Sequence, residues 1–485
     1  MQVHETHISI VFLAGEFAYK IKKAIHTDFL DYRTLDRRKH FCDEEVRLDG
    51  RYSRDLYIGV VPIGWEDGHL QVGSKKEPVE FAVKMRRFPA GSLLSERLAA
   101  GKLTTAEVHQ QAETIADFHQ SSEVANANVA AQWPDYFVNN VHQIFQTLEP
   151  KLSQETQATL KVIQNWIDQW SQDHPDALAR RVKQGAIREC HGDLHVDNVV
   201  QWDGRLVPFD GIEFSEQLRW IDVLCDAAFL EMDLAYRDHL DLARTFMNHY
   251  LETTGDYESL ELRRPFLIYR ALVRALVAII RSDQSQLSAG EREEALADAC
   301  QHVRLAYRFT LKETPQLWIT HGFSGSGKTT FSETVVQRHD AIRLRSDTER
   351  KRLFGLHPTD RPSPSMQAQV YSDGSNERTY THLESLAKAT LQAGYGVIVD
   401  ATFLRQRDRQ RFHDLARREG VEYVILDCRA DHQTLRQRVA DRMAGNQDAS
   451  DANLDVLEHQ FRSDEPLTPA EMKHVVVLPD FADRL

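Results

Sequence analysis

One short stretch in the last third of the chain constrains the fold most. Residues 316–330 read QLWITHGFSGSGKTT, a strand-like run followed by a loop with three glycines, a lysine and two threonines. The spacing Gly322-x-x-x-x-Gly327-Lys328-Thr329 lets successive backbone N–H groups point inward around a phosphate at the start of a helix. The sequence therefore predicts a strand, a phosphate-binding loop and a helix, in that order.

The chemistry of this loop predicts ATP and Mg²⁺ as cofactors. The amine of Lys328 can reach the β- and γ-phosphates and assist catalysis, and the hydroxyl of Thr329 can hold Mg²⁺. The residues predicted to bind the nucleotide here are Gly322, Ser324, Gly325, Ser326, Gly327, Lys328, Thr329 and Thr330.

Further apolar runs follow the loop at regular intervals. AIRLRS, YGVIVDA, EYVILDC and HVVVLP alternate with helical segments up to about residue 480. This alternation predicts βαβ units and a parallel sheet. We expect the domain to begin after the KETP stretch at 312–315 and to cover residues 313–485.

Polar residues follow two of these strands. Asp347 is predicted to act as the base for an attacking hydroxyl, and Arg350 to bind a substrate anion; a helix-capping aspartate and a solvated arginine are the alternatives. Asp400 is predicted to support the Mg²⁺ site through water, or to cap a helix.

Arginines are clustered in the same domain. Arg438 and Arg442 lie four residues apart, so they share one helical face, where they can contact phosphates from a lid or be solvated. The arginines at alternate positions from 405 to 411 are predicted to be mostly at the surface.

These motifs resemble those of small P-loop kinases, a group that includes zeta toxins, polynucleotide 5′-kinases and gluconate-type kinases. Asp347-x-x-Arg350 is similar to the DxxR element of polynucleotide kinases, where the aspartate is the base. The resemblance covers about 170 residues and implies a kinase.

The first part of the chain carries a second constellation. Residues 191–198 read HGDLHVDN, and PFDGIEF follows with Asp210. Phosphoryl transfer in kinase folds needs one carboxylate for the acceptor hydroxyl, and an amide and a second carboxylate for Mg²⁺. Asp193, Asn198 and Asp210 fit these roles, with a strand pair around 199–209 bringing Asp210 back beside the loop.

This pattern resembles aminoglycoside phosphotransferase-like kinases, which include choline and fructosamine kinases, over residues 5–310. The resemblance implies ATP between a small lobe at about 1–90 and a helical large lobe at about 91–312. It implies a nucleotide-binding lysine, Lys20 in preference to Lys22, and a partner carboxylate, Glu45 in preference to Glu44. Few residues precede HISIVFL, so the first strand is expected to be short or missing.

The predicted fold is an α+β protein-kinase-like, two-lobed domain at 1–312, followed by an α/β P-loop NTPase domain with a parallel sheet. The whole order resembles the bacterial bifunctional aminoglycoside phosphotransferase/ATP-binding proteins, with P-loop domains of the AAA type.

The composition of the chain indicates the cell compartment of the protein and the classes of partner that it can bind. No apolar run reaches eighteen residues, the N-terminus lacks a signal-peptide pattern, and the five cysteines form no CxxC pair. These features predict a cytoplasmic protein with no membrane partner. Of the net charge of −14, −11 falls in residues 1–312, which disfavours nonspecific nucleic-acid binding. The oligomeric state stays open.

The sequence thus predicts an ATP-dependent phosphotransferase with two nucleotide sites that acts on hydroxyl groups of small molecules. Two alternatives remain: a P-loop kinase regulated by a ligand-binding N-terminal domain, and 5′-hydroxyl polynucleotide kinase activity in the C-terminal domain. Overall acidity makes nucleic acid the weaker acceptor.

Overall fold

The computed structural model describes residues 2–6, 8–26, 30–285, 287–358, 360, 366, 369–370, 372–445 and 453–477. The chain forms two compact units. The first contains Met1–His239 and Leu262–Thr310, and the second contains Leu240–Glu261 and Leu311–Leu485. The predicted first domain, 1–312, therefore includes one segment that the structure places in the second unit.

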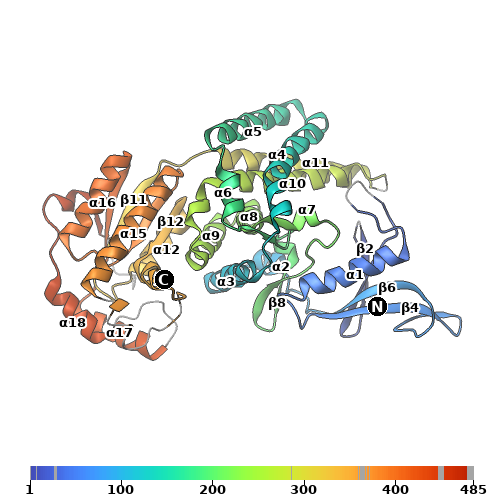
Figure 1. Ribbon diagram of the computed structural model, residues 1–485, viewed down its shortest axis with the longest axis horizontal. Helices are drawn as coiled ribbons and strands as arrows, with labels where there is room; N and C mark the ends of the chain where they lie inside the picture. The colour runs from blue at the N-terminus through green and yellow to red at the C-terminus, as the bar shows by residue number, and fades with distance from the viewer. Residues whose placement is uncertain are drawn as a thin grey trace. The chain divides into compact units, whose positions relative to one another are not determined.

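The first unit begins with an antiparallel sheet in the strand order β1-β2-β3-β6-β4-β5 (Figure 1). Its strands are β1 (Gln2–Glu5), β2 (Ser9–Ala14), β3 (Phe17–Lys22), β4 (Tyr57–Glu66), β5 (His69–Val72) and β6 (Pro78–Arg86). A first strand is thus present, and it is only four residues long. The helix α1 (Leu35–Asp49) packs against β6 and β4.

Local chemistry explains these elements. The side chain of Thr34 caps α1 by accepting a hydrogen bond from the Arg37 N–H. Gly15 supplies the positive φ of the turn between β2 and β3, where Ala14 pairs with Phe17. Alternation along β3 turns Lys20 and Lys22 to the same, buried side of the sheet.

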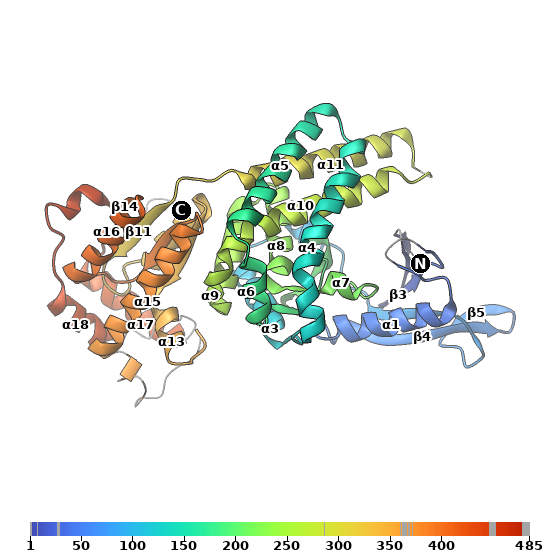
Figure 2. The same cartoon turned by 45° about the horizontal axis from the view of Figure 1, so that its top comes forward.

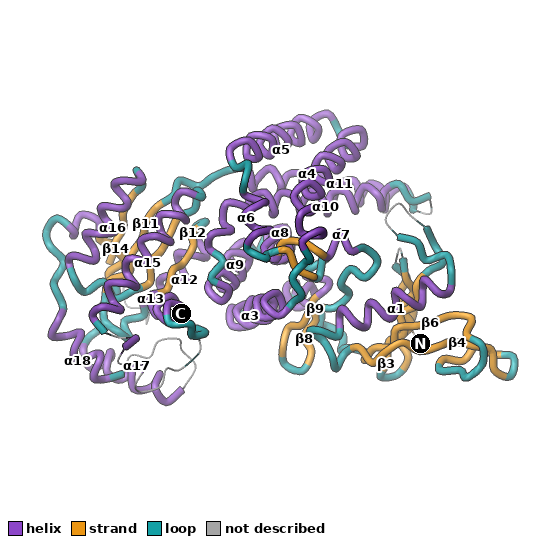
Figure 3. Tube along the Cα trace, in the orientation of Figure 1, coloured by secondary structure: helices purple, strands orange, loops and turns teal. Residues whose placement is uncertain are grey.

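The rest of the first unit is mostly helical, as predicted, with two short strand pairs (Figure 3). Strand β7 (Ile187–Glu189) pairs with β10 (Trp220–Asp222), and β8 (Val199–Trp202) forms a hairpin with β9 (Arg205–Pro208). The helices are α2 (Leu94–Ala99), α3 (Thr105–Ser121), α4 (Ala127–Leu148), α5 (Gln154–Asp173), α6 (Ala177–Lys183), α7 (Glu216–Arg219), α8 (Val223–Tyr236), α10 (Leu260–Ser282) and α11 (Ala289–Thr310).

The second unit contains a five-stranded sheet in the order β12-β13-β11-β14-β15 (Figure 2). Every neighbouring pair in this sheet is parallel, which confirms the predicted sheet type. The strands are β11 (Gln316–His321), β12 (Ala341–Arg345), β13 (Gly396–Asp400), β14 (Glu422–Asp427) and β15 (Val475–Val477). Strands β11 to β13 are almost continuously buried, as expected for a sheet with helices on both faces.

Helices surround this sheet. They are α9 (Leu240–Thr254), α12 (Lys328–Arg338), α13 (Ser346–Leu353), α15 (Asp373–Gln392), α16 (Gln406–Glu419), α17 (His432–Gly445) and α18 (Leu454–Ser463). The helix α9 packs along α12 and beside β12, and α15 packs against α16. No sequence feature indicated that α9 would join this sheet.

One surface prediction is wrong. Arg409 is almost fully buried, and its guanidinium donates to Glu471 over 2.7 Å and to the backbone oxygen of Phe403 over 3.0 Å. The side chain bridges α16 to the strand-end loop before it and to the segment before β15. Its neighbours at 405, 407 and 411 do not share this full burial.

No helix in the described part of the chain combines the length and the apolar character needed to cross a bilayer.

Candidate active sites

The phosphate loop (residues 322–329) has the backbone geometry that its glycines predict. Gly322, Gly325 and Gly327 all have positive φ, at 143°, 84° and 88°. A Cβ atom added to Gly322 would lie 2.4 Å from the backbone oxygen of Cys428. The loop can therefore adopt this shape only with glycine at that position, and α12 begins directly after it.

Two observations fit a bound phosphate. The hydroxyl of Ser326 is buried and has no hydrogen-bond partner within the described residues. The amine of Lys328 folds back over the loop and donates to the backbone oxygen of Phe323 over 2.7 Å. A phosphate inside the loop would give the Ser326 hydroxyl an acceptor and the Lys328 amine a further one.

Neighbouring helices hold the loop from outside. The Ser324 N–H donates to the side-chain oxygen of Gln460 on α18 over 2.9 Å, and the Gln460 amide returns a 3.0 Å bond to the Ser324 hydroxyl. Arg438 on α17 is exposed and donates to the Gly325 oxygen over 3.3 Å. The side chain of Arg442 lies outside the described residues.

Of the two residues predicted for Mg²⁺ in this domain, Thr329 lies at the start of α12 and Asp400 at the end of β13. The side chains of Thr329 and Thr330 are exposed in the first turn of α12. Asp400, at the end of β13, is buried and accepts a 3.1 Å hydrogen bond from Ser332, one turn further along α12. The structure thus brings Asp400 next to the helix that carries Thr329.

Asp347 and Arg350 lie on α13, directly after β12. Asp347 is half-buried and makes no hydrogen bond or ion pair with any residue that the structure describes. Arg350 is buried and donates to Asn376 on α15 over 2.7 Å and to the Val370 oxygen over 3.4 Å.

In the first unit, the HGD loop (residues 191–198) brings its predicted residues together. The amide of Asn198 donates to the Asp193 carboxylate and to the Asp193 backbone oxygen, both over 3.0 Å. The ring of His195 lies 3.3 Å from the same carboxylate. Burial alone would raise the pKa of Asp193, but the His195 ring lowers it well below its usual range.

The loop is held by carboxylates that the sequence did not single out for this task. Asp226 on α8 accepts from the backbone N–H groups of His191 and Gly192, over 3.0 and 2.9 Å, and contacts His119 at 3.1 Å. Asp233, two turns further, accepts from the Val196 N–H. Burial opposes ionisation of Asp226, yet its hydrogen bond to His119 and nearby cations lower its pKa to about 2.

The small-lobe lysine and glutamate also meet. The Lys20 amine contacts Glu45 at 3.0 Å and also bonds Asp210. Burial opposes the charge on Lys20, but Asp210 and Glu45 raise its pKa above the ordinary value. Lys20, Glu45 and Asp210 therefore form one ionic chain.

The second lysine extends this chain. Lys22 contacts the other Glu45 oxygen at 2.7 Å and bonds Glu213, which also accepts from the Tyr32 hydroxyl. The alternation of β3 indicated that both lysines face one side, but nothing in the sequence identified Tyr32. Glu45 thus binds two buried cations at once.

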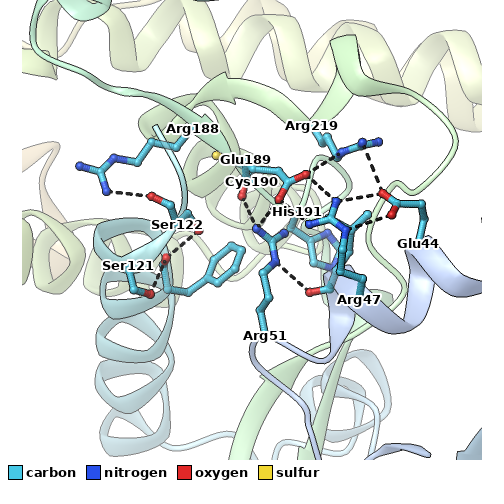
Figure 4. Close-up of polar contacts among 12 residues, drawn as sticks. Glu44, Arg47, Arg51, Ser121, Ser122, Arg188, Glu189, Cys190, His191 and Arg219 are labelled. Atoms are coloured by element: carbon cyan, nitrogen blue, oxygen red, sulfur yellow. Dashed lines mark hydrogen bonds and ion pairs between the residues drawn. The ribbon is translucent and has the colours of Figure 1, made fainter. Parts of the chain in front are cut away.

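A cluster of arginines joins α1 to the strand before the HGD loop (Figure 4). Glu189, with only 5% of its side chain exposed, contacts Arg47 at 2.8 Å, Arg51 at 3.1 Å and Arg219 at 3.1 Å. Arg51 also donates to the Glu189 backbone oxygen over 2.9 Å. Since Glu189 ends β7, the cluster ties the helix of Glu45 to the start of the loop.

Residues 317–467 match a family model described as an AAA domain. An uncharacterized protein of Mycobacterium tuberculosis is 29% identical over 93% of this chain and 88% of its own length. Among solved structures, a putative kinase from Chloroflexus aurantiacus covers 34% of this chain and 85% of its own (22% identity, TM-score 0.28). An ethanolamine kinase from Plasmodium vivax covers 64% and 83% (13% identity, TM-score 0.39).

The Glu189 cluster predicts a large loss of stability when its charge is removed. We expect Glu189→Gln to lower the free energy of unfolding by about 3 kcal/mol, because three arginines lose their buried partner. Urea denaturation measures the change. Glu216→Gln is the matched control, since Glu216 lies 3.7 Å from the same Arg219 but is 77% exposed. Equal losses in both variants would contradict the role of Glu189.

The environment of Asp49 predicts that the free energy of unfolding depends on pH. It accepts from the Tyr52 hydroxyl and the Gly211 N–H, its second oxygen is buried without a partner, and burial raises its pKa to about 7. The folded state therefore holds a proton that the unfolded state has released, and stability falls as pH rises from about 4 to 7.

We expect Asp49→Asn to keep both accepted hydrogen bonds and to remove this dependence. As pH rises from 5 to 8, the unfolding free energy of the variant should increase by about 2 kcal/mol relative to that of wild type. The unfolding free energy of both proteins, measured at each pH, checks this. Asp43→Asn, an exposed change on the same helix, is the control. A gap between Asp49→Asn and wild type that does not change with pH would refute the assignment.

Proposed function

We propose that the chain is an ATP-dependent kinase with two phosphotransfer sites, each of which moves the γ-phosphoryl group of ATP to a hydroxyl group of a small molecule. The observation that carries the proposal is that each unit has its own set of groups for this reaction. Neither set borrows a residue from the other unit.

In the first unit, the residues fit a nucleotide with Mg²⁺. Lys20, held by Glu45, would bind phosphate oxygens. The Asn198 amide nitrogen is used by Asp193, and its oxygen accepts no hydrogen bond from the described residues, so that oxygen and Asp210 can hold a hard cation. MgATP supplies the phosphoryl group and the charge neutralisation.

Asp193 acts on the acceptor in this proposal. The Asn198 amide and the His195 ring fix its carboxylate, and 38% of the Asp193 side chain is exposed. An acceptor hydroxyl can therefore reach it, donate its proton to the carboxylate and be oriented for attack. The depressed pKa keeps Asp193 ionised, so it positions the hydroxyl throughout the physiological pH range.

In the second unit, the phosphate loop would hold the β- and γ-phosphates. Lys328 would leave the Phe323 oxygen for a phosphate oxygen, and Ser326 would donate its hydroxyl. Thr329 would hold Mg²⁺ directly, with Asp400 behind it through Ser332 or water. Of these groups, the Ser326 hydroxyl has no hydrogen-bond partner among the described residues, and Thr329 is exposed.

Asp347 is the proposed base of this second site. Its carboxylate follows the edge strand β12 at the end where ligands bind in open α/β sheets. Arg350 remains the proposed contact for an anionic group of the acceptor, beside its bond to Asn376.

The proposal predicts two separable activities. With γ-labelled ATP and a pooled metabolite extract, we expect wild type to form at least two labelled products. Asp193→Asn should lower one of them by about 100-fold or more, because the acceptor proton loses its base. Lys328→Ala should abolish the other, because the phosphates lose their cation.

Two variants that change exposed residues of the same types serve as matched controls. Asp203→Asn changes an exposed aspartate in the β8–β9 turn, and Lys388→Ala an exposed lysine on α15; both should leave all products unchanged. Loss of label only in Lys328→Ala would favour a ligand-binding regulator in the first unit. Label on a 5′-hydroxyl oligonucleotide, but on no metabolite, would favour polynucleotide phosphorylation. Wild type that labels neither metabolites nor the oligonucleotide would overturn the kinase proposal.

A further inference from the structure

The segment Leu240–Glu261 belongs to the second unit, although the residues before and after it belong to the first. Its helix α9 packs along α12 and next to β12. Strand β12 is the last strand of the sheet, so one of its sides has no strand partner. An unpaired strand side leaves backbone groups that need hydrogen bonds.

One side chain of α9 bonds two of these groups. The Asn248 side-chain oxygen accepts from the Arg343 N–H over 2.7 Å, and its amide nitrogen donates to the Ala341 oxygen over 3.0 Å. Asn248 is buried, so neither bond competes with water. The amide takes the place of a neighbouring strand and fixes α9 in register with β12.

One turn further along α9, Glu252 binds the end of the same strand. Its carboxylate accepts from Arg345 over 2.9 Å and from Arg343 over 3.2 Å. It also accepts from the Thr348 hydroxyl on α13 over 3.1 Å. Glu252 is 3% exposed and therefore joins β12 to the first turn of α13 from inside the unit.

A backbone contact strengthens this junction. Arg352 on α13 donates to the backbone oxygen of Glu252. A Cβ atom on Gly255 would lie 2.6 Å from the Arg352 side chain, so the glycine after α9 leaves room for that arginine. The C-terminal end of α9 thus contacts α13 through both side chain and backbone.

These contacts flank Asp347 in the sequence. Arg345 stands two residues before it and Thr348 directly after it, and both bind Glu252. Asp347 itself bonds no described residue, so its position depends on the backbone of the β12–α13 corner (residues 345–348).

We propose that Glu252 is a positioning residue of the C-terminal phosphotransfer site. It fixes the β12–α13 corner that carries Asp347. This inference rests on the proposed kinase function of the second unit. The site that begins with the phosphate loop is therefore completed by a helix lying more than sixty residues before that loop in the sequence.

Glu252→Gln in the full chain tests the proposal. The measured activity is the label transfer from γ-labelled ATP that is lost in Lys328→Ala. We expect kcat for this transfer to fall at least about tenfold while KM for ATP stays within about twofold, since the phosphate loop is untouched. The product that depends on Asp193 should not change. Asp241→Asn, an exposed carboxylate change at the start of α9, should leave both activities as in wild type.

Hydrogen–deuterium exchange gives a readout that needs no acceptor. In Glu252→Gln, backbone amides of residues 341–353 should exchange faster than in wild type and in Asp241→Asn. If Glu252→Gln does not fold, Thr348→Val removes only the bond to α13, and it should lower kcat severalfold with KM for ATP unchanged.

The outcomes separate the two proposals. Wild type without any Lys328-dependent transfer would overturn the kinase function, and exchange at 341–353 would then decide alone whether Glu252 fixes the corner. Unchanged exchange, or an unchanged kcat in a folded variant, would overturn the role of Glu252. A rise in KM for ATP with kcat preserved would also overturn it, because the effect would then lie in the phosphate loop.

Discussion

Asp226 lies at the start of α8, fully buried, and its two oxygens accept backbone N–H groups from consecutive residues of the HGD loop. Arg270 on α10 donates to the Gly192 oxygen over 3.1 Å and also lies 3.9 Å from Asp226. The peptide groups around Gly192 are therefore bonded through both their donors and an acceptor. The positions of Asp193 and Asn198 depend on this anchoring, because both follow Gly192 within six residues.

In the second unit, a buried carboxylate likewise fixes the backbone that carries the proposed site residue. Glu252 is a buried carboxylate that binds a strand end and the following helix, as Asp226 binds a strand end and the following loop. Burying such charges costs free energy, and well-packed apolar residues of similar size are often at least as stabilising. A carboxylate differs from an apolar side chain because its oxygens accept hydrogen bonds from donors at suitable angles. It therefore fixes the position and orientation of the groups that donate to it. We infer that these residues serve the geometry of the two loops more than the stability of the fold.

The residues that form the motifs could be predicted from the sequence. The residues that bind these motifs and fix their positions could not. The phosphate loop could be predicted because its spacing is local: glycines, lysine and threonine act within eight residues. The parallel sheet followed from the alternation of apolar strands with helices. Glu252, by contrast, meets Arg343 across 91 residues, and a lone glutamate near the end of a helix gives no local sign of that contact. Arg409 was missed for a similar reason, since its partner Glu471 is 62 residues away.

The position of α9 in the second unit also determines which fragments of the chain keep that unit intact. A fragment that begins at Leu311 contains the whole stretch that matches the AAA family model, and it would be the natural choice from sequence alone. Such a fragment would lose the Asn248 amide from the edge of β12 and would leave Arg343 and Arg345 without Glu252. These two arginines of the strand before Asp347 would then lack the carboxylate that they share, in a strand edge open to pairing with other chains. The intact second unit therefore includes the segment Leu240–Glu261, which stands between two parts of the first unit in the sequence, so the proposed second site has to be studied in the full chain.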